Sequence, residues 1–205
     1  MPNSIAVFPM HVTSILVLAG RLIGDSNPVH IFQPNRDLQD SRSGSIWDWP
    51  NAAAEPASEK YQLTAVRSDQ SPQDAALLVY LTASVPDTEL PWQAMSTVKI
   101  TAQEHGHSVV VTQRDLHLLA EKYGDALRIL QDEWRVDRVH LLVIAPASAC
   151  VLLGQKLQAR HHAPVTLYER RRAATSVACG PFTPTIAVSP TAVSLVNTDR
   201  SISLL

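Results

Sequence analysis

The sequence predicts an α/β fold built on a mainly parallel, three-layer sheet. Short apolar segments typical of strands alternate with segments whose apolar residues recur every three or four positions, as in helices. Parallel neighbours need crossover connections, which are usually helices, so this alternation favours a parallel sheet. A strand–helix–strand pattern near the N-terminus also returns late in the chain. That repeat predicts two halves related by a pseudo-two-fold axis, with two equivalent loops facing one shared ligand.

The repeat relates the segment 7–20 to the segment 142–154. Ser14 corresponds to Ser148 and Gly20 to Gly154, each 134 positions later (148 minus 14). After a two-residue insertion, Pro28 corresponds to Pro164.

Composition places the chain among globular proteins. Its 205 residues are 45% hydrophobic and 18% charged, enough for one domain with a substantial core or for two small halves. The formal charge of -2 gives no overall basic field that would attract long nucleic acid, whereas a small nucleotide needs only a few local cations. We therefore expect no long nucleic acid as a partner.

No segment resembles a membrane span or a signal peptide. The longest apolar stretch, 12–19, is far shorter than the ~20 residues a transmembrane helix needs, and no basic segment precedes it. Cys150 and Cys179 could pair, but Cys150 lies in an apolar helical run where a buried free thiol is expected. We expect a cytoplasmic, reduced protein with no membrane partner.

The N-terminal elements form a β-α-β unit. An apolar run at 5–10 leads to a helical pattern over 13–23 that stops near Gly24, and 29–33 alternates like a strand. The polar segment 35–60 follows, with the cluster Trp47-Asp48-Trp49-Pro50; segments this long without an obvious element are functional loops or disorder.

The second half repeats the alternation. Thr112 and Asp115 have the spacing of a capping box, and an apolar face continues from there to about Trp134, which predicts a long helix. The other predicted elements are strands at 77–82, 98–102, 108–112, 139–144 and 165–168, and a buried helix at 148–157. Residues 185–188 are expected to form an edge strand, followed by a weakly ordered tail or a partner-binding segment.

Ligands of parallel sheets bind beyond the carboxyl ends of the strands, where both repeated turns are expected. Each turn begins a helix with small or hydroxyl residues: Thr13 and Ser14 in one, and Ser148 after Pro146 in the other. Free backbone N–H groups there bind phosphate. The alternative is that Ser14 and Ser148 are ordinary helix caps.

Arginines follow the last strand of each repeat. Gln33 and Arg36 follow the first, and the run from Tyr168 through Glu169 and Arg170 follows the second. Arginine binds phosphate through its planar fork, and Tyr168 can stack on a base. A solvated basic run at a strand end is the alternative.

Trp47 and Trp49 alternate in a polar loop, so one is expected to pack on the core while the other offers a platform for a base. His11 lies in the repeated turn and could bond a ligand phosphate or base. The other histidines lack metal-ligand spacing, so no metal is expected. No Ser-His-Asp order, Walker loop or G-x-G-x-x-G is present, and no catalytic residue is predicted.

Two groups of segments resemble a SAVED domain. Ile5-Ala6-Val7-Phe8-Pro9, Leu18-Ala19-Gly20, Arg36-Asp37 and Trp47-Asp48-Trp49 are similar to its first half. The second half is similar in Val139-His140-Leu141-Leu142, Ala145-Pro146-Ala147-Ser148-Ala149, Leu153-Gly154 and Leu167-Tyr168-Glu169-Arg170. The resemblance implies two fused CARF-like Rossmannoid halves, about 1–75 and 76–188, in a sensor domain over 1–188 with a tail at 189–205.

This resemblance implies a sensor of cyclic oligonucleotides in the antiphage systems known as CBASS and type III CRISPR. Such a sensor binds a cyclic di-, tri- or tetranucleotide, oligomerises, and activates a nuclease, TIR or protease effector. Two features differ from the family: His11-Val12-Thr13 replaces a turn that usually carries prolines, and no effector domain is recognisable in the 205 residues. The effector is therefore expected on a separate chain, or the sequence is an excised sensor.

The predicted ligand-binding residues are His11, Thr13, Ser14, Gln33, Arg36, Trp47, Pro146, Ser148, Tyr168, Glu169 and Arg170. No cofactor is expected besides the cyclic oligonucleotide ligand. Two alternatives remain open: an enzyme that cleaves its own cyclic ligand with His11 or Ser148, and a structural interaction subunit that has lost ligand binding.

Overall fold

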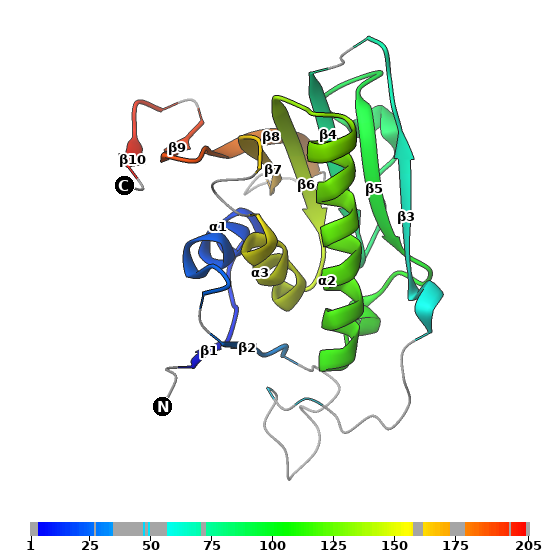
Figure 1. Cartoon of the computed structure of the whole chain (residues 1–205), viewed down its shortest axis with the longest axis vertical. Coiled ribbons are helices and arrows are strands. Elements are labelled where there is room, and N and C mark those ends of the chain that lie inside the picture. The colour runs from blue at the N-terminus through cyan, green and yellow to red at the C-terminus, as the bar shows by residue number, and fades with distance from the viewer. Residues whose placement is uncertain are drawn as a thin grey trace.

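The structure is a computed structural model. It describes residues 4–26, 28–34, 47, 49, 57–70, 73–157, 162–172, 179–196 and 198–203. It shows a mixed α/β fold with a mainly parallel central sheet (Figure 1). Most of the predicted loop at 35–60, including Arg36, lies outside the described residues.

A large sheet has the strand order β10-β9-β8-β7-β6-β4-β5-β3. Its members are β3 (Tyr61–Val66), β4 (Asp74–Tyr80), β5 (Ser96–Ala102), β6 (Arg138–Ile144), β7 (Val165–Arg172), β8 (Cys179–Val188), β9 (Ala192–Leu195) and β10 (Ser201–Ser203). The central strands β5, β4, β6 and β7 are mutually parallel, as the alternation of strands and helices predicts. The strands on either side of them run antiparallel.

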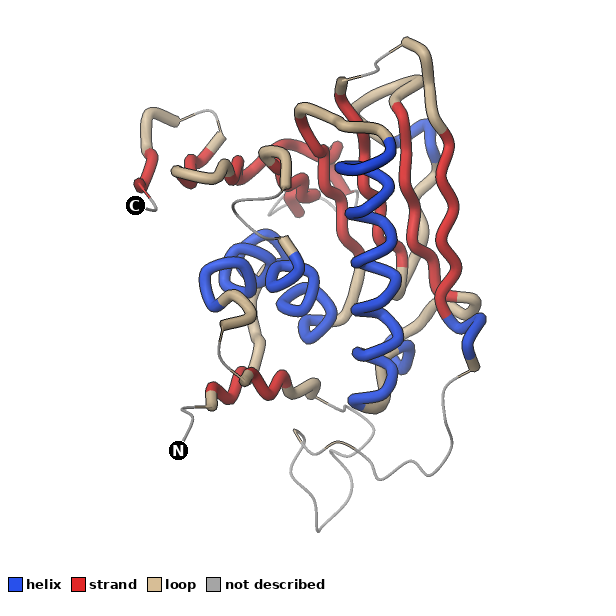
Figure 2. Tube along the Cα trace, viewed as in Figure 1, coloured by secondary structure: helices blue, strands red, loops and turns tan. Residues whose placement is uncertain are grey.

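A second, two-stranded sheet pairs β1 (Ile5–Val7) with β2 (Val29–Ile31) in parallel. The crossover between these strands is α1 (Thr13–Ile23), which gives the β-α-β unit predicted from the sequence. The corresponding late unit consists of β6, α3 (Ala147–Lys156) and β7. Helices α1 and α3 lie between the small sheet and the large one (Figure 2).

The long helix α2 (Gln113–Arg128) lies along one face of the large sheet and continues as a π-helical turn (Ile129–Glu133). The predicted capping box is confirmed at its start. The Asp115 amide donates to Thr112 Oγ1 at 3.2 Å, and the Thr112 amide donates to Asp115 Oδ2 at 2.9 Å. Both bonds satisfy N–H groups that a helix leaves unpaired at its first turn.

The central strand β4 is buried on both faces of the large sheet. Along β4, Leu77 and Val79 enter the core beneath the helices, whereas Leu78 and Tyr80 enter a second core on the opposite face. The β4–β5 connection covers that second core, and it packs Leu90, Trp92 and Met95 against the sheet. Burial on both faces explains why β4 is a continuous apolar run in the sequence.

The sequence interpretation is wrong at 108–112, where a strand was expected. A 3-10 turn (His107–Val109) and an irregular segment lead into α2 there. Val109 and Val110 are buried, and the Tyr61 hydroxyl donates to Val109 O at 2.8 Å. The β-branched residues reflect burial in the core and not pairing in a sheet.

The C-terminal part is more ordered than the sequence suggests. The predicted edge strand at 185–188 is the end of the longer β8, which lies between β7 and β9 and is therefore not at an edge. Beyond it, β9 and β10 extend the sheet where a weakly ordered tail was one alternative. The strand β3 was not predicted at all, because its sequence follows a long polar segment without a clear boundary.

The pseudo-two-fold relation between complete halves is not confirmed. The first repeat carries a two-stranded sheet, whereas the second belongs to the eight-stranded one. The predicted division near residue 75 stays a prediction, and β3, which precedes it, pairs with β5 beyond it.

Candidate functional site

Helices α1 and α3 run parallel and pack closely side by side. Contacts between them advance in the same direction along both, pairing Thr13 with Cys150, Val17 with Gly154 and Arg21 with Leu157. The last of these is a hydrogen bond of 2.7 Å from Arg21 Nη1 to Leu157 O. The N-termini of the two helices are therefore neighbours. We call residues 12–14 and 146–148 the paired N-termini.

No side chain at either N-cap position bonds the first turn. The N-cap residues are Val12 in α1 and Pro146 in α3, and neither carries a side-chain acceptor. The alternative that Ser14 and Ser148 are ordinary caps is wrong, because both lie inside the helices. The free N–H groups of these turns must bond to acceptors from elsewhere.

The acceptors come from the second strand of each β-α-β unit or from the residues just beyond it. The Ser14 amide donates to Glu169 Oε1 of β7 at 2.6 Å. The Ser148 amide donates to Gln33 Oε1, just beyond β2, at 3.1 Å. Helix α1 is thus bonded by the strand that follows α3, and α3 by the strand that follows α1.

Gln33 and Glu169 hold corresponding places in the repeat, since each lies five residues after its proline, Pro28 or Pro164. The structure therefore brings together four of the predicted residues, Ser14, Gln33, Ser148 and Glu169. Gln33 lies just beyond the parallel pairing of β2 with β1, and Glu169 just beyond the parallel pairing of β7 with β6. This is the edge of a parallel sheet where ligands bind.

Ser14 and Ser148 are buried inside the paired N-termini. Ser148 Oγ is fully buried and has no hydrogen-bond partner among the described residues. Thr13 bonds the thiol of Cys150, and burial raises the pKa of that thiol to about 12. Cys150 is a buried free thiol, as the sequence predicts.

Aromatic rings lie beyond the ends of β1 and β2. Phe8 and Phe32 stack with centroids 4.7 Å apart and planes 7° from parallel. Trp47 meets Phe8 edge-on at 5.4 Å, and half of the Phe8 side chain (52%) remains exposed. Phe8 and Phe32 were missed from the sequence; the signal was an aromatic residue directly after each of two parallel strands.

Trp49 has the role predicted for one of the two tryptophans. Its ring packs against the core, and its Nε1 donates to Ile31 O at 3.1 Å. Trp47 is the one that joins the aromatic group at Phe8.

Tyr168 and Arg170 lie on the opposite face of the large sheet from Glu169, because side chains alternate along a strand. The Tyr168 hydroxyl is 2.9 Å from His140 Nδ1, and its ring meets Trp92 edge-on at 4.9 Å. Burial raises the pKa of Tyr168. The structure therefore places Tyr168 beside Trp92, on the face of the second core and not beside the paired N-termini.

Arg170 has two partners on that face. Its guanidinium forms an ion pair with Glu89 and lies 4.4 Å from the centre of the Phe182 ring. This is an anchor for the β4–β5 connection, so Arg170 is also separated from Ser14 and Ser148.

The remaining predicted residues differ in their surroundings. His11 is exposed in the turn before α1, Pro146 is the N-cap of α3, and Arg36 lies outside the described residues. Within the described ranges, no three His, Cys, Asp or Glu side chains are grouped so that they could hold a metal ion. None of the helices in those ranges is long and apolar enough to cross a membrane.

Solved structures show the same fold in a larger receptor. Three structures of the Acinetobacter baumannii Cap4 receptor, which contains a SAVED/CARF domain, match the chain at 12% identity. The structure with 2'3'3'-cAAA has a TM-score of 0.64 and is matched over 91% of this chain and 39% of the receptor. The structure with 3'3'3'-cAAA has a TM-score of 0.65 over 90% and 38%, and a third structure has 0.59 over 89% and 35%.

The chain thus spans about two fifths of the receptor that it matches. Comparison with curated proteins gives no match. A family model does match, namely the SMODS-associated and fused to various effectors sensor domain, SAVED, over residues 2–188. That match covers most of the sequence and agrees with the resemblance carried by its repeated motifs, so the chain belongs to the SAVED sensor-domain family.

Proposed function

We propose that this chain is a sensor module that binds a cyclic oligonucleotide of two to four nucleotides. The observation that carries the proposal is the pair of adjacent, parallel helix N-termini at the carboxyl ends of β1 and β6. Such termini present backbone N–H groups and partial positive charge to a phosphate, and a cyclic oligonucleotide carries several phosphates. Family membership and the ligands of the Cap4 receptor support the same ligand class.

The aromatic group beside this site supplies the second part of recognition. Phe8 is half exposed and already stacks on Phe32, so its free face offers a planar surface to a base. Base stacking on an aromatic side chain contributes about 1–3 kcal/mol and tolerates any base. In the proposal the bases stack on Phe8 and Trp47. The phosphates bind at the two helix turns, which are formed by Thr13 with Ser14 and by Pro146 with Ser148. Further polar contacts come from His11 and Arg36.

Binding is proposed to change the assembly state. In this view the ligand orders a new surface, a second copy of the chain docks on it, and the assembly activates an antiphage nuclease, TIR or protease effector, fused or separate. This proposal rests on the family, whose model describes a sensor domain fused to various effectors.

No geometry in the described residues favours the enzyme alternative. Cleavage of a cyclic oligonucleotide needs a nucleophile or base that can reach the phosphate. Among the described contacts no base bonds to the Ser148 hydroxyl, so nothing there activates it as a nucleophile. His11 is exposed and would have to act alone.

The test is to mix the full chain with a panel of cyclic di-, tri- and tetranucleotides, including 2'3'3'-cAAA and 3'3'3'-cAAA. Calorimetry measures binding, light scattering measures mass, and chromatography measures whether the ligand stays intact. Linear oligonucleotides of the same bases are the control. Binding of an intact cyclic ligand with growth in mass supports the sensor, linear product supports the enzyme, and no binding across the panel contradicts both.

A further inference from the structure

Two parallel helices that begin side by side concentrate positive potential. Each N-terminus carries the equivalent of roughly half a positive charge, and neighbouring parallel dipoles repel each other. The paired N-termini therefore need a counter-ion. Among the described residues, the carboxylate bonded there is Glu169, whose Oε1 lies 2.6 Å from the Ser14 amide.

The equivalent position at α3 is neutral. Gln33 accepts the Ser148 amide through its side-chain oxygen at 3.1 Å, a longer bond without a charge. Ser148 Oγ, in the same turn, is buried and has no partner among the described residues. An unpaired buried hydroxyl costs free energy, so this turn gains from a ligand oxygen that pairs it.

We propose that Glu169 is the resident counter-ion of the paired N-termini and that a ligand phosphate enters at the α3 turn and replaces it. The inference rests on the proposed function and adds which residue limits the affinity of the site for anions. Glu169 repels the ligand until the phosphate takes its place, so the carboxylate lowers affinity for every anion at this site. Gln33 bonds the other turn without bringing a charge to it, which makes the two turns unequal despite the repeat.

Two matched variants change one charge each, at the corresponding positions 169 and 33. Glu169→Gln keeps an acceptor at α1 but removes the charge, and Gln33→Glu adds a charge at α3 with almost the same shape. A carboxylate at a helix N-terminus stabilises the helix. Glu169→Gln is therefore expected to lower the thermal midpoint of the free protein, and Gln33→Glu to hold or raise it.

Affinity is expected to move the opposite way from stability. Calorimetry with 2'3'3'-cAAA and 3'3'3'-cAAA should show about tenfold tighter binding by Glu169→Gln and about tenfold weaker binding by Gln33→Glu. A nearby unit charge shifts a protonation equilibrium by about 1–3 powers of ten, and we expect its effect on the binding of a phosphate to have the same sense. The double variant, which moves the charge from α1 to α3, should bind less tightly than Glu169→Gln. Glu121→Gln, an exposed change on α2, serves as the charge control and should match the unmodified chain.

A second measurement separates this inference from the proposed function. Millimolar inorganic phosphate should raise the thermal midpoint of Glu169→Gln more than that of the unmodified chain. If phosphate does so but no cyclic oligonucleotide binds, the role of Glu169 as counter-ion is supported and the sensor proposal fails. If the cyclic trinucleotides bind the unmodified chain and Glu169→Gln equally, and phosphate does not distinguish them, Glu169 is only a helix cap. Should Glu169→Gln fail to fold, unchanged affinity of Gln33→Glu overturns the inference.

Discussion

Gly20 and Gly154 each face a main-chain carbonyl of the opposite helix. A Cβ atom built on Gly20 would lie 2.0 Å from Val151 O, and one built on Gly154 would lie 2.0 Å from Val17 O. No side chain fits at either position, because real Cβ contacts are never so short. The absence of a side chain at these two positions lets α1 and α3 approach closely, and this close packing brings their N-termini next to each other.

Gly154→Ala is expected to destabilise the chain by about 1–3 kcal/mol or more, the usual cost of overpacking a buried contact. The methyl group would also lie 2.8 Å from the Arg21 amide, so α1 has to move away. Urea unfolding measures the change. Gly124→Ala is the matched control in α2, where the added Cβ meets no atom within 4 Å. The control should stabilise the chain slightly, since alanine favours a helix by up to about 1 kcal/mol over glycine. If Gly154→Ala loses no stability and behaves like the control, the α1–α3 crossing tolerates a side chain.

Asp115→Asn is expected to reduce the free energy of unfolding by about 2 kcal/mol at pH 7, as for charged hydrogen bonds. Burial alone would raise the pKa of Asp115, but hydrogen bonds from Lys60 and from the Val111 and Thr112 amides outweigh it and lower that pKa. The Lys60 Nζ to Asp115 Oδ1 distance is 2.5 Å.

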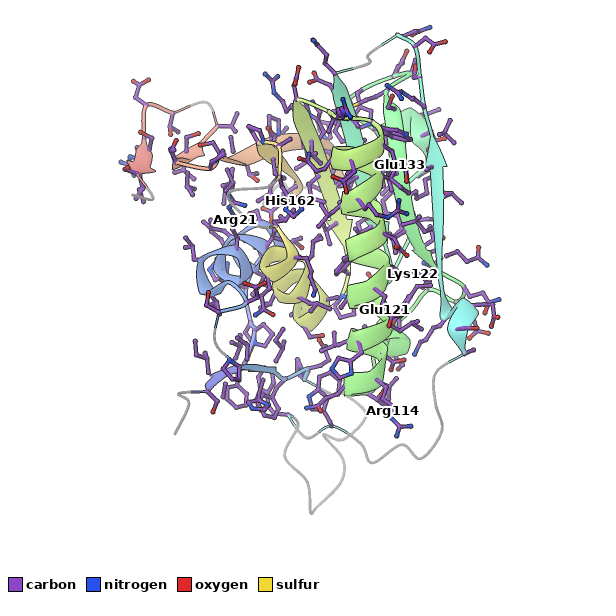
Figure 3. The ribbon with its side chains drawn as sticks, in the orientation of Figure 1. Arg21, Arg114, Glu121, Lys122, Glu133 and His162 are labelled. Atoms are coloured by element: carbon purple, nitrogen blue, oxygen red, sulfur yellow. The ribbon has the colours of Figure 1, made fainter. Side chains whose placement is uncertain are left out.

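The sign of the pH effect follows from this direction. A carboxyl with a lowered folded pKa stabilises the fold above its unfolded pKa of about 4, and this contribution is lost as the pH falls through the folded value. Urea unfolding between pH 7 and pH 3 should therefore show a weaker acid dependence for Asp115→Asn. Glu121, exposed on α2 (Figure 3), gives the control Glu121→Gln, which should keep the full dependence.

Phe8→Ala is expected to weaken binding of a cyclic oligonucleotide by about 1–3 kcal/mol, the contribution of one stacked base. The thermal midpoint should change little because Phe8 is half exposed. Calorimetry measures the affinity, and Phe8→Tyr, which keeps the ring, should restore it. Leu22→Ala, an equally exposed apolar change near the end of α1, is the control. Normal affinity of Phe8→Ala would place the bases elsewhere.

Arg170→Ala distinguishes a structural arginine from a ligand contact. Its ion pair with Glu89 is partly exposed, so its loss should cost about 1 kcal/mol or less, with a further loss from the contact with Phe182. Glu89→Gln should lower stability by a similar amount through the same pair. If Arg170 only anchors the β4–β5 connection, both variants keep their affinity for the cyclic trinucleotides. If Arg170→Ala alone loses about 1–3 kcal/mol of binding, the arginine bonds the ligand as the sequence suggested.

The regular elements were the most predictable part of the fold. The α1, α2 and α3 helices and the parallel strands β4, β6 and β7 follow from apolar periodicity, and the Thr112–Asp115 box from its spacing. The strand β3 and the extended β8, β9 and β10 depend on pairing between distant segments. A single sequence carries little signal for such pairing, because strand preference reflects the neighbours that a strand packs against.

The sequence by itself determined the repeat, and with it the two helix starts and the equivalence of Ser14 with Ser148. Only the tertiary structure decided the directions of the side chains around them. Because side chains alternate along β7, Glu169 points to α1, whereas Tyr168 and Arg170 lie on the opposite face. On that face Tyr168 contacts Trp92, and Arg170 forms an ion pair with Glu89. The partner of each residue depends on which segment the fold brings to that face. That depends on packing across more than a hundred residues, which local pattern does not encode.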